Sequence, residues 1–352
     1  MNSNPISLNE CLSAFVYLQN ERCDGVEMNS PQDTQYAHNI PSFSKVIHVF
    51  SKEWKGIRSA VGAMSGAKLV VTADRGLASD EMHFALNNIR MFKKAIFHGV
   101  SANGRALIEH LHRHGGPECY VVWHGSHAQL SVDSERPLFW ATKRLYEKGL
   151  IRKMHIMREG CHLLLNSWPE ALFNVPLNVE GKKSCQKISE GGIAIVPLTT
   201  SLGKNLYTNI IAAAVSPKIK TIITYNGNDL SEIFREKSIK LLRHDGVAGH
   251  LKVLQECSIS LNVTCVDCQP MVDLEALAVG TPAITGPLFL EQHFKSSYPH
   301  ITTVQNPLST VEIVKAIDRL DDIPQDELSS MMLEYKAELI QKHIESYNNF
   351  LA

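Results

Sequence analysis

Two acidic residues stand eight positions apart where a predicted loop meets a predicted helix. Asp267 lies in the loop after an apolar strand at Ser258–Val263, and Glu275 lies in the first turns of a helix over Val272–Val279. The first turn of a helix carries unsatisfied N–H groups and a partial positive charge. The pattern therefore predicts a site for a phosphate or another anion beside two carboxylates.

A second anion-binding pattern lies upstream, between a strand at Ile193–Val196 and a helix at Leu206–Val215. The connecting segment 197–205 is rich in hydroxyl groups and contains one glycine and one lysine, Gly203 and Lys204. The amides of such a loop and the lysine can together surround an anion. An exposed lysine at a helix start gives the same pattern, so the residues alone leave both interpretations open.

The segment around Glu275 resembles a known family. Retaining family-4 glycosyltransferases of the GT-B fold carry a Glu, seven intervening residues and a second Glu, followed by Ala, a few residues and Gly-Thr-Pro. Here the matching residues are Asp267, Glu275-Ala276 and Gly280-Thr281-Pro282. Asp in place of the first Glu keeps the charge and shortens the side chain by one methylene. The resemblance covers residues 192–286.

The resemblance implies a site for a nucleotide-sugar donor in the carboxyl-terminal half of the chain. By resemblance, Glu275 binds the ribose hydroxyls and Asp267 contacts the transferred sugar. The N–H groups of Met271 and Val272 would then hold the diphosphate. An ordinary capped helix with exposed acidic residues is the alternative interpretation of this segment.

The family also places a basic pair, an Arg and a Lys, in the upstream loop. Only Lys204 matches here. Arg243 is the candidate for the second cation, and a solvated surface arginine is the alternative. The remaining donor-binding candidates are Gly125, Ser126, Thr200, Ser201, Gly203 and Asn205.

In the amino-terminal half, Trp123-His124-Gly125 follows a strand at Cys119–Val122. Histidine can give or take a proton near neutral pH, and glycine lets the backbone approach a ligand. A histidine at this place often lies beside the reacting sugar in GT-B enzymes, so the resemblance makes His124 a catalytic candidate. Trp-His-Gly is also similar to the motif of CDP-glycerol glycerophosphotransferases, where that histidine is the proposed base. The other catalytic candidates are Lys204, Asp267 and Glu275.

Three residues are candidates for an acceptor site: Lys55, Gly56 and Arg158. Lys55-Gly56 follows the first predicted strand, where GT-B enzymes often have a glycine-rich loop. Arg158 follows a strand-like segment at 154–157 and could supply a cation or form a simple ion pair. No Gly-x-Gly-x-x-Gly follows a predicted strand, which argues against a classical NAD enzyme.

Apolar runs rich in β-branched residues alternate with amphipathic runs, which is typical of parallel sheets covered by helices. The predicted strands are 46–50, 68–72, 95–98 and 119–123, then 193–196, 221–224, 258–261 and 282–285. We therefore expect an α/β fold with two Rossmann-like parallel-sheet domains facing across a cleft. The expected parts are an extension at 1–44 with a helix at 7–20, an acceptor domain at 45–178, a donor domain at 179–324, and a helix at 325–352 that crosses back to the first domain.

Composition narrows the possible functions. The formal net charge is −1, so no overall basic field favours nucleic acid as a partner. No apolar run reaches the ~18 residues of a membrane-spanning helix, and the first residues lack a secretory signal pattern, so we expect a cytoplasmic protein. The 8 cysteines are scattered, which favours reduced thiols. Cys265 and Cys268 alone are poor evidence for zinc, and no metal site is expected.

Together these observations predict a metal-independent glycosyltransferase that uses a nucleotide-diphosphate sugar and a hydroxyl acceptor. Retention of configuration is implied by the resemblance alone. No cofactor is expected, because the nucleotide sugar is a substrate. Three alternatives stay open: a CDP-glycerol-type glycerophosphotransferase, a glycosyltransferase that acts on modified bases in DNA, and a sugar-nucleotide-binding protein without activity.

Overall fold

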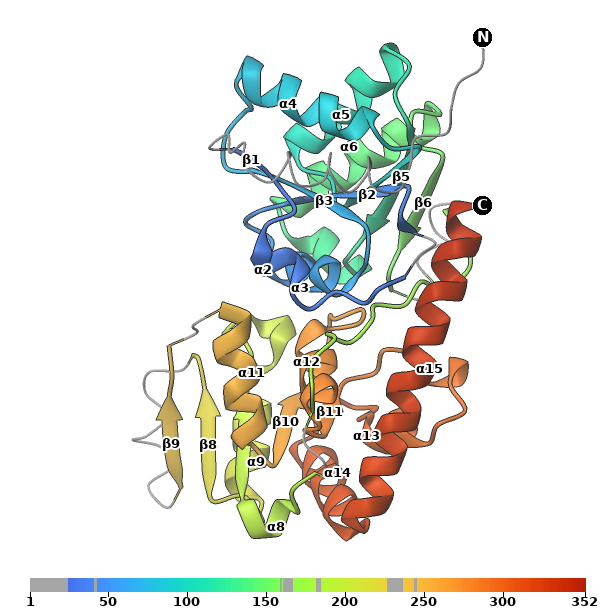
Figure 1. Ribbon diagram of the computed structural model, residues 1–352. Coiled ribbons are helices and arrows are strands. Elements are labelled where there is room, and N and C mark those ends of the chain that lie inside the picture. Colours follow the sequence, from blue (N-terminus) through green and yellow to red (C-terminus); the bar gives the residue numbers. More distant parts are fainter. Residues whose placement is uncertain are drawn as a thin grey trace. The chain divides into compact units, whose positions relative to one another are not determined.

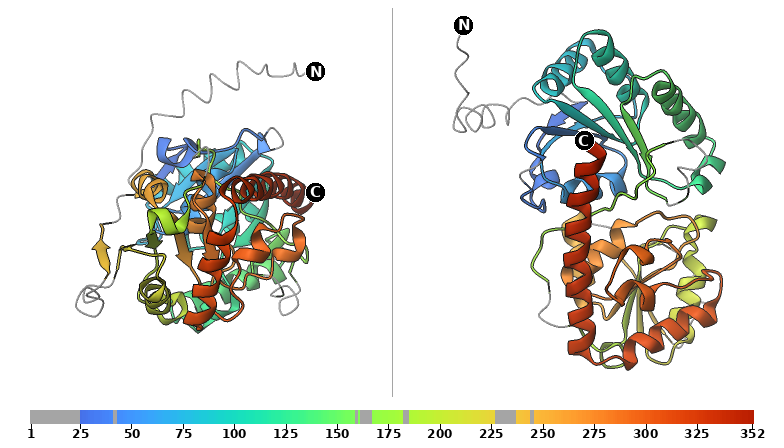
Figure 2. Two further views of the ribbon diagram at one scale, coloured as in Figure 1. Left: turned by 90° about the horizontal axis from the view of Figure 1, so that it is seen from below. Right: turned by 90° about the vertical axis from the view of Figure 1, so that its right-hand side faces the viewer.

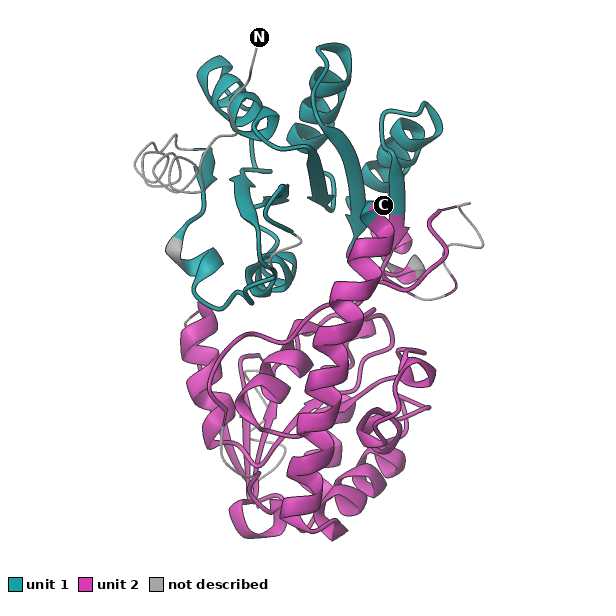
Figure 3. Cartoon of the chain, turned by 45° about the vertical axis from the view of Figure 1, so that its right-hand side comes forward, with its two compact units in different colours: residues 1–123, 133–154, 351 teal, residues 124–132, 155–350, 352 magenta. Residues whose placement is uncertain are grey.

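The computed structural model of the chain contains two α/β units (Figure 1, with further views in Figure 2). It describes residues 25–40, 43–158, 160, 167–181, 185–226, 237–243 and 246–352. The first unit comprises residues 1–123, 133–154 and 351, and the second comprises 124–132, 155–350 and 352 (Figure 3). The helix predicted at 7–20 lies outside the described residues. The boundaries expected at 44, 178 and 324 and the return of the last helix remain predictions.

The first sheet has six strands in the order β1-β3-β2-β4-β5-β6. Its strands are β1 (Val26–Met28), β2 (Val46–Ser51), β3 (Ala67–Val71), β4 (Lys94–His98), β5 (Glu118–Trp123) and β6 (Lys153–Ile156). Strand β2 pairs in parallel with β3 and β4, and β4 pairs in parallel with β5. Every residue of β2 and β3 is buried, because helices cover both faces of the sheet.

The helices between these strands are α2 (Pro31–Thr34), α3 (Lys55–Ala63), α4 (Ser79–Arg90), α5 (Ala102–Arg113) and α6 (Glu135–Glu147). The strand order reverses between β2 and β4, so right-handed crossovers put α3 on one face and α4, α5 and α6 on the other. Figure 1 shows this division, with α2 beside α3. The reversal between β2 and β4 also marks where a crevice opens at the carboxyl ends of the strands.

The second sheet has five strands in the order β11-β10-β7-β8-β9, and all of its pairings are parallel. Its strands are β7 (Ile193–Val196), β8 (Thr221–Thr224), β9 (Ser238–Leu241), β10 (Ile259–Asn262) and β11 (Ala283–Thr285). Here the order reverses between β7 and β10. These two strands are therefore the ones whose following loops should form a ligand crevice.

The second unit contains α8 (Ile188–Gly191), α9 (Leu206–Val215), α11 (Gly246–Glu256), α12 (Met271–Val279), α13 (Tyr298–Thr302), α14 (Thr310–Asp322) and α15 (Gln325–Leu351). Short 3-10 turns lie at His127–Ser131, Leu202–Lys204 and Glu291–His293. Helix α11 packs against α12, and α9 packs against α14. Figure 2 shows α15 as one continuous helix.

The structure confirms two parallel-sheet, Rossmann-like units, and it adds two strands that the sequence did not indicate. Strand β1 lies in the extension expected at 1–44, where no strand was predicted, and it pairs antiparallel with β3, which gives the first sheet one antiparallel edge. Strand β9 is an edge strand of mostly exposed residues, so it lacks the apolar run that marked the other strands. No helix in the described part of the chain is long and apolar enough to cross a membrane.

Candidate functional site

The loops after β7 and β10 meet at the reversal point of the second sheet. The N–H of Cys265 donates a hydrogen bond to the carbonyl of Gly203 over 3.0 Å. The ammonium of Lys204 forms an ion pair with Oδ1 of Asp267. A Cβ atom on Gly203 would lie 2.6 Å from Cγ1 of Val266, so any other residue here would have to displace the Val266 side chain. The structure thus brings two predicted catalytic residues together, Lys204 from one loop and Asp267 from the other.

Two asparagines fix these loops from inside the unit. Asn205 has a φ of 59°, and its Nδ2 donates to the carbonyl of Val263 over 3.0 Å. Asn209 is fully buried; its Nδ2 donates to the carbonyls of Asn205 and Val263, and its Oδ1 accepts from the N–H of Val263. Asn205 therefore has a structural role, and its predicted contact with a donor stays a prediction.

Arg158 joins this cluster from the segment after β6. A guanidinium N–H donates to the main-chain carbonyl of Asp267. The guanidinium carbon lies 5.0 Å from the centroid of the Phe289 ring, and Arg158 is 7% exposed. Arg158, predicted for an acceptor site, thus belongs to the same cluster as Lys204. Arg243, predicted as the second cation, is an exposed residue just after β9.

Glu275 lies beside His250, on the neighbouring helix α11. It is 5% exposed on α12, and its Oε2 lies 3.5 Å from Nε2 of His250 on α11. Nδ1 of the same histidine lies 2.7 Å from the Tyr225 hydroxyl, just past β8. Burial and the nearby Glu275 raise the pKa of Tyr225 above its usual range. The predicted contact of this carboxylate with a ribose remains a prediction.

The start of α12 lies directly after the Asp267 loop. The helix begins at Met271, with Pro270 as its N-cap. The N–H groups of Met271 and Val272 belong to the first turn, where no carbonyl of the helix can accept from them. Thr200 and Ser201 are exposed in the facing loop. The amides, the hydroxyls and Lys204 are groups that favour an anion.

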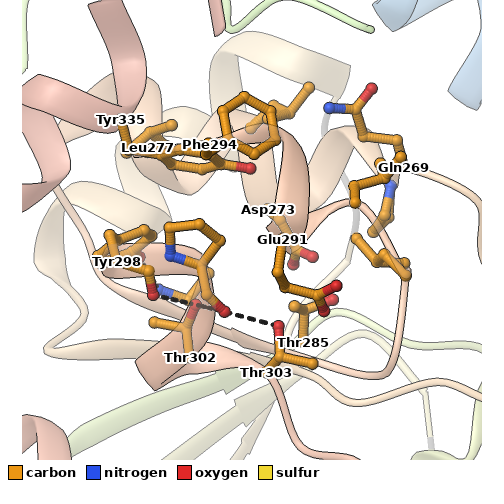
Figure 4. Close-up of a pocket in the computed structure, with 16 residues that line it drawn as sticks. Gln269, Asp273, Leu277, Thr285, Glu291, Phe294, Tyr298, Thr302, Thr303 and Tyr335 are labelled. Atoms are coloured by element: carbon orange, nitrogen blue, oxygen red, sulfur yellow. Dashed lines mark hydrogen bonds between the residues drawn. The ribbon is translucent and has the colours of Figure 1, made fainter. Parts of the chain in front are cut away.

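A cavity of about 40 Å³ lies in the second unit beside α12, with room for about three water molecules. Figure 4 shows Asp273, Glu291 and Thr285 gathered on one side, with the rings of Phe294 and Tyr335 on the other. Burial raises the pKa of Asp273 to about 8, so this carboxyl group is protonated at neutral pH. The cavity is too small for a sugar nucleotide.

His124 is the first residue after β5 and is half-buried, while Gly125 and Ser126 are buried. Burial, with a smaller contribution from His155, lowers the pKa of His124 to about 3. The imidazole is therefore neutral at pH 7. A group with so low a pKa is a weak proton acceptor, but it can still donate or accept a hydrogen bond.

Lys55 and Gly56 form the exposed start of α3, at the reversal point of the first sheet. The preceding Trp54 packs against Gly99, where a Cβ atom would lie 2.6 Å from the indole. Gly99 has a φ of 66°, which glycine adopts without strain. The loops after β2 and β4 therefore lie together, as the strand order requires.

Within the described residues, no group of three or more His, Cys, Asp and Glu side chains could hold a metal ion. Cys119, Cys185, Cys265 and Cys268 are free thiols. Burial raises the pKa of Cys268 to about 11, so this thiol stays protonated at neutral pH.

The sequence signalled some of these residues only partly. Asn209 is a polar residue in an otherwise apolar helix, which could have indicated a buried hydrogen bond. No sequence pattern indicated the contacts of Arg158 with Asp267 or of His250 with Glu275, because each pair is far apart in the sequence.

No family model matches the sequence, and no curated protein sequence matches it. Solved structures do match. The structure of TarM has 13% identity and a TM-score of 0.54, over 76% of this chain and 57% of TarM, so the chain spans just over half of that protein. Anabaena Alr3699/HepE in complex with UDP and glucose has 10% identity and a TM-score of 0.55, over 88% and 100% of the two chains.

A UDP-forming α,α-trehalose-phosphate synthase from Burkholderia xenovorans, in complex with glucose-6-phosphate, has 9% identity and a TM-score of 0.52. That match covers 87% of this chain and 99% of the synthase. At such low identities the matches establish the fold alone. The two Rossmann-like units of this chain have the GT-B architecture.

Proposed function

We propose that this chain transfers a glycosyl group from a nucleotide-diphosphate sugar to a hydroxyl acceptor. The observation that carries the proposal is the joining of Lys204 and Asp267 at the reversal point of the second sheet, beside the first turn of α12. A cation and helix N–H groups favour a diphosphate, and a carboxylate accepts hydrogen bonds from sugar hydroxyls. The fold agrees with this proposal, since HepE was solved with UDP and glucose.

In the proposed reaction, the acceptor oxygen forms a bond to the anomeric carbon as the bond from that carbon to the diphosphate oxygen breaks. The electron pair of the broken bond stays on the diphosphate, and the acceptor proton passes to that leaving oxygen. Lys204 and the amides of Met271 and Val272 stabilise the growing negative charge. This charge stabilisation needs no metal ion, and transfer with retention is part of the proposal.

His124 fits this scheme as a neutral residue that orients a sugar. Its lowered pKa leaves the imidazole uncharged at pH 7, so it adds no positive charge for a phosphate. Its weak basicity argues against proton abstraction and favours a hydrogen bond to a hydroxyl group.

A nucleotide panel tests the proposal directly. The full chain is mixed with UDP, GDP, ADP, CDP and TDP, their glucose esters and CDP-glycerol, and the melting temperature and nucleotide release are measured. We expect one nucleoside diphosphate and its sugar ester to raise the melting temperature, because binding stabilises the folded state by mass action. Lys204→Met should weaken that binding about tenfold or more.

Lys315 on α14 offers a matched control, because it is an exposed lysine of the same unit. Lys315→Met should bind nucleotides like the wild type. Binding of CDP-glycerol in preference to every sugar nucleotide would replace the proposal with glycerophosphate transfer. Binding without any release of nucleotide, also when glycerol and simple sugars are supplied as hydroxyl acceptors, would indicate a binding protein. No binding at all would reject the proposed site.

A further inference from the structure

The side chain of Arg158 contacts the backbone of the predicted donor loop. Its guanidinium donates to the carbonyl of Asp267, and the side chain of the same residue holds Lys204. We propose that Arg158 is a positioning residue that fixes the Asp267 peptide and so aims the Asp267 carboxylate at the sugar of the donor. This inference rests on the proposed function, and it assigns to Arg158 a role distinct from an acceptor-binding cation.

The burial of Arg158 argues for positioning rather than direct contact with phosphate. The residue is 7% exposed, and the Phe289 ring covers its guanidinium at 5.0 Å. The ring covers one face of the guanidinium, and the burial of the residue as a whole limits the access of a phosphate to its N–H groups. Lys204, whose side chain is 35% exposed, is the more accessible cation of the two.

The backbone of Phe289 gives independent support. Phe289 has a φ of 60°, a left-handed conformation that costs free energy for any residue with a side chain. The residue is 49% exposed, so burial of its side chain does not explain the conformation. The conformation does place the ring over Arg158, where a cation–π contact holds the guanidinium against the loop.

The second carboxylate oxygen of Asp267, Oδ2, is the atom that this positioning would present to the sugar. Oδ1 is used by Lys204, whereas Oδ2 is buried and accepts no hydrogen bond from the described part of the chain. A buried carboxylate oxygen without a donor is costly, and a sugar hydroxyl would supply that donor. A shift of the Asp267 peptide would turn this oxygen away from the sugar.

Binding experiments separate positioning from phosphate contact. For the nucleotide that binds in the panel, dissociation constants are measured for the diphosphate and for its glucose ester; their ratio gives the contribution of the sugar. We expect Arg158→Met and Asp267→Asn each to lower this ratio about tenfold. The double variant should lower it no further, because both changes remove one interaction. Arg158→Lys keeps one donor and should restore part of the ratio.

Two results would overturn the inference. One is an Arg158→Met variant that loses diphosphate affinity with an unchanged ratio, which would make Arg158 a phosphate ligand. The other is full additivity of the two substitutions.

A ligand-free measurement separates this inference from the proposed function. Hydrogen exchange of the amides in 264–273 should become faster in Arg158→Met and stay unchanged in Lys315→Met. Unchanged exchange in Arg158→Met would reject the positioning role even if the nucleotide panel succeeds. Faster exchange in a chain that binds no nucleotide would reject the proposed function and leave the contact between Arg158 and the loop intact.

Discussion

The ammonium of Lys204 and the carboxylate of Asp267 form an ion pair that joins the loops after β7 and β10. The lysine side chain is 35% exposed and the aspartate side chain 12%, so solvent screens the pair only in part. Without a ligand, the ammonium pairs with Oδ1 of Asp267, and Oδ2 has no donor among the described residues. A diphosphate that binds Lys204 must therefore compete with Asp267 for the same ammonium group.

Removing this competition should separate diphosphate binding from sugar transfer. Asp267→Asn keeps the shape of the side chain and releases Lys204, so we expect free nucleoside diphosphate to bind about threefold more tightly, as for a partly exposed ion pair. Glycosyl transfer should fall at the same time, because the sugar loses its carboxylate partner. Calorimetric titration and nucleotide release measure the two effects, and weaker binding of the free diphosphate would contradict this competition.

The second prediction concerns the stability of the fold and Asn209, whose side chain hydrogen-bonds to Asn205 and Val263. Asn209→Ala leaves the buried N–H of Val263 without its acceptor, whereas the Val263 carbonyl keeps its hydrogen bond from Asn205, so the free energy of unfolding should fall by about 2 kcal/mol. Urea unfolding followed by circular dichroism measures this loss. Asn348 is exposed on α15, and Asn348→Ala should change stability by less than about 0.5 kcal/mol. Equal losses in the two variants would show that the buried amide is not a structural tie.

Much of this arrangement was predictable because it depends on local pattern. The strands at 193–196 and 221–224 and the helix at 206–215 match β7, β8 and α9 to the residue. Apolar runs and helix ends determine such elements, and neighbours in sequence carry the signal. The sequence also indicated that Lys204 and Asp267 follow parallel strands, which brings such loops to one edge of the sheet.

The partners that needed long-range contacts could not be predicted. Arg158 is 109 positions from Asp267, and its burial depends on the backbone of Phe289. Glu275 lies on the buried face of α12, against His250, because α11 and α12 share one face of the sheet. The spacing of two acidic residues along the chain does not reveal which neighbour will cover each of them, so both were expected at one site.

The lowered pKa of His124 predicts how acid affects stability. The folded chain binds this proton at a pKa of about 3, below the ordinary value of 6.5, so the unfolded chain takes it up first as pH falls. His124 therefore favours the folded state fully above pH 6.5, and this contribution is lost as pH falls toward 3. His124→Gln should lose less stability than the wild type between pH 7 and pH 4.5. Parallel losses in urea titrations would show that His124 titrates normally.

The raised pKa of Asp273 predicts the opposite dependence. The folded chain keeps this proton up to a pKa of about 8, whereas the unfolded chain releases it near 3.8, so rising pH favours unfolding across this range. The contribution is fully present below pH 3.8 and is lost as pH rises through about 8. Asp273→Asn keeps a neutral side chain at every pH, so its stability relative to wild type should grow from pH 5 to pH 8, by up to about 1.4 kcal/mol per pH unit.

Melting temperatures and urea titrations of the two proteins at pH 5, 6.5 and 8 measure this difference. Asn348 is an exposed residue of α15, so Asn348→Ala should follow the wild type at all three pH values. A constant difference between Asp273→Asn and wild type would mean that the carboxyl group is already ionised in the fold. The cavity beside α12 would then hold a charge that Thr285 and its neighbours stabilise, in place of the protonated acid inferred from its burial.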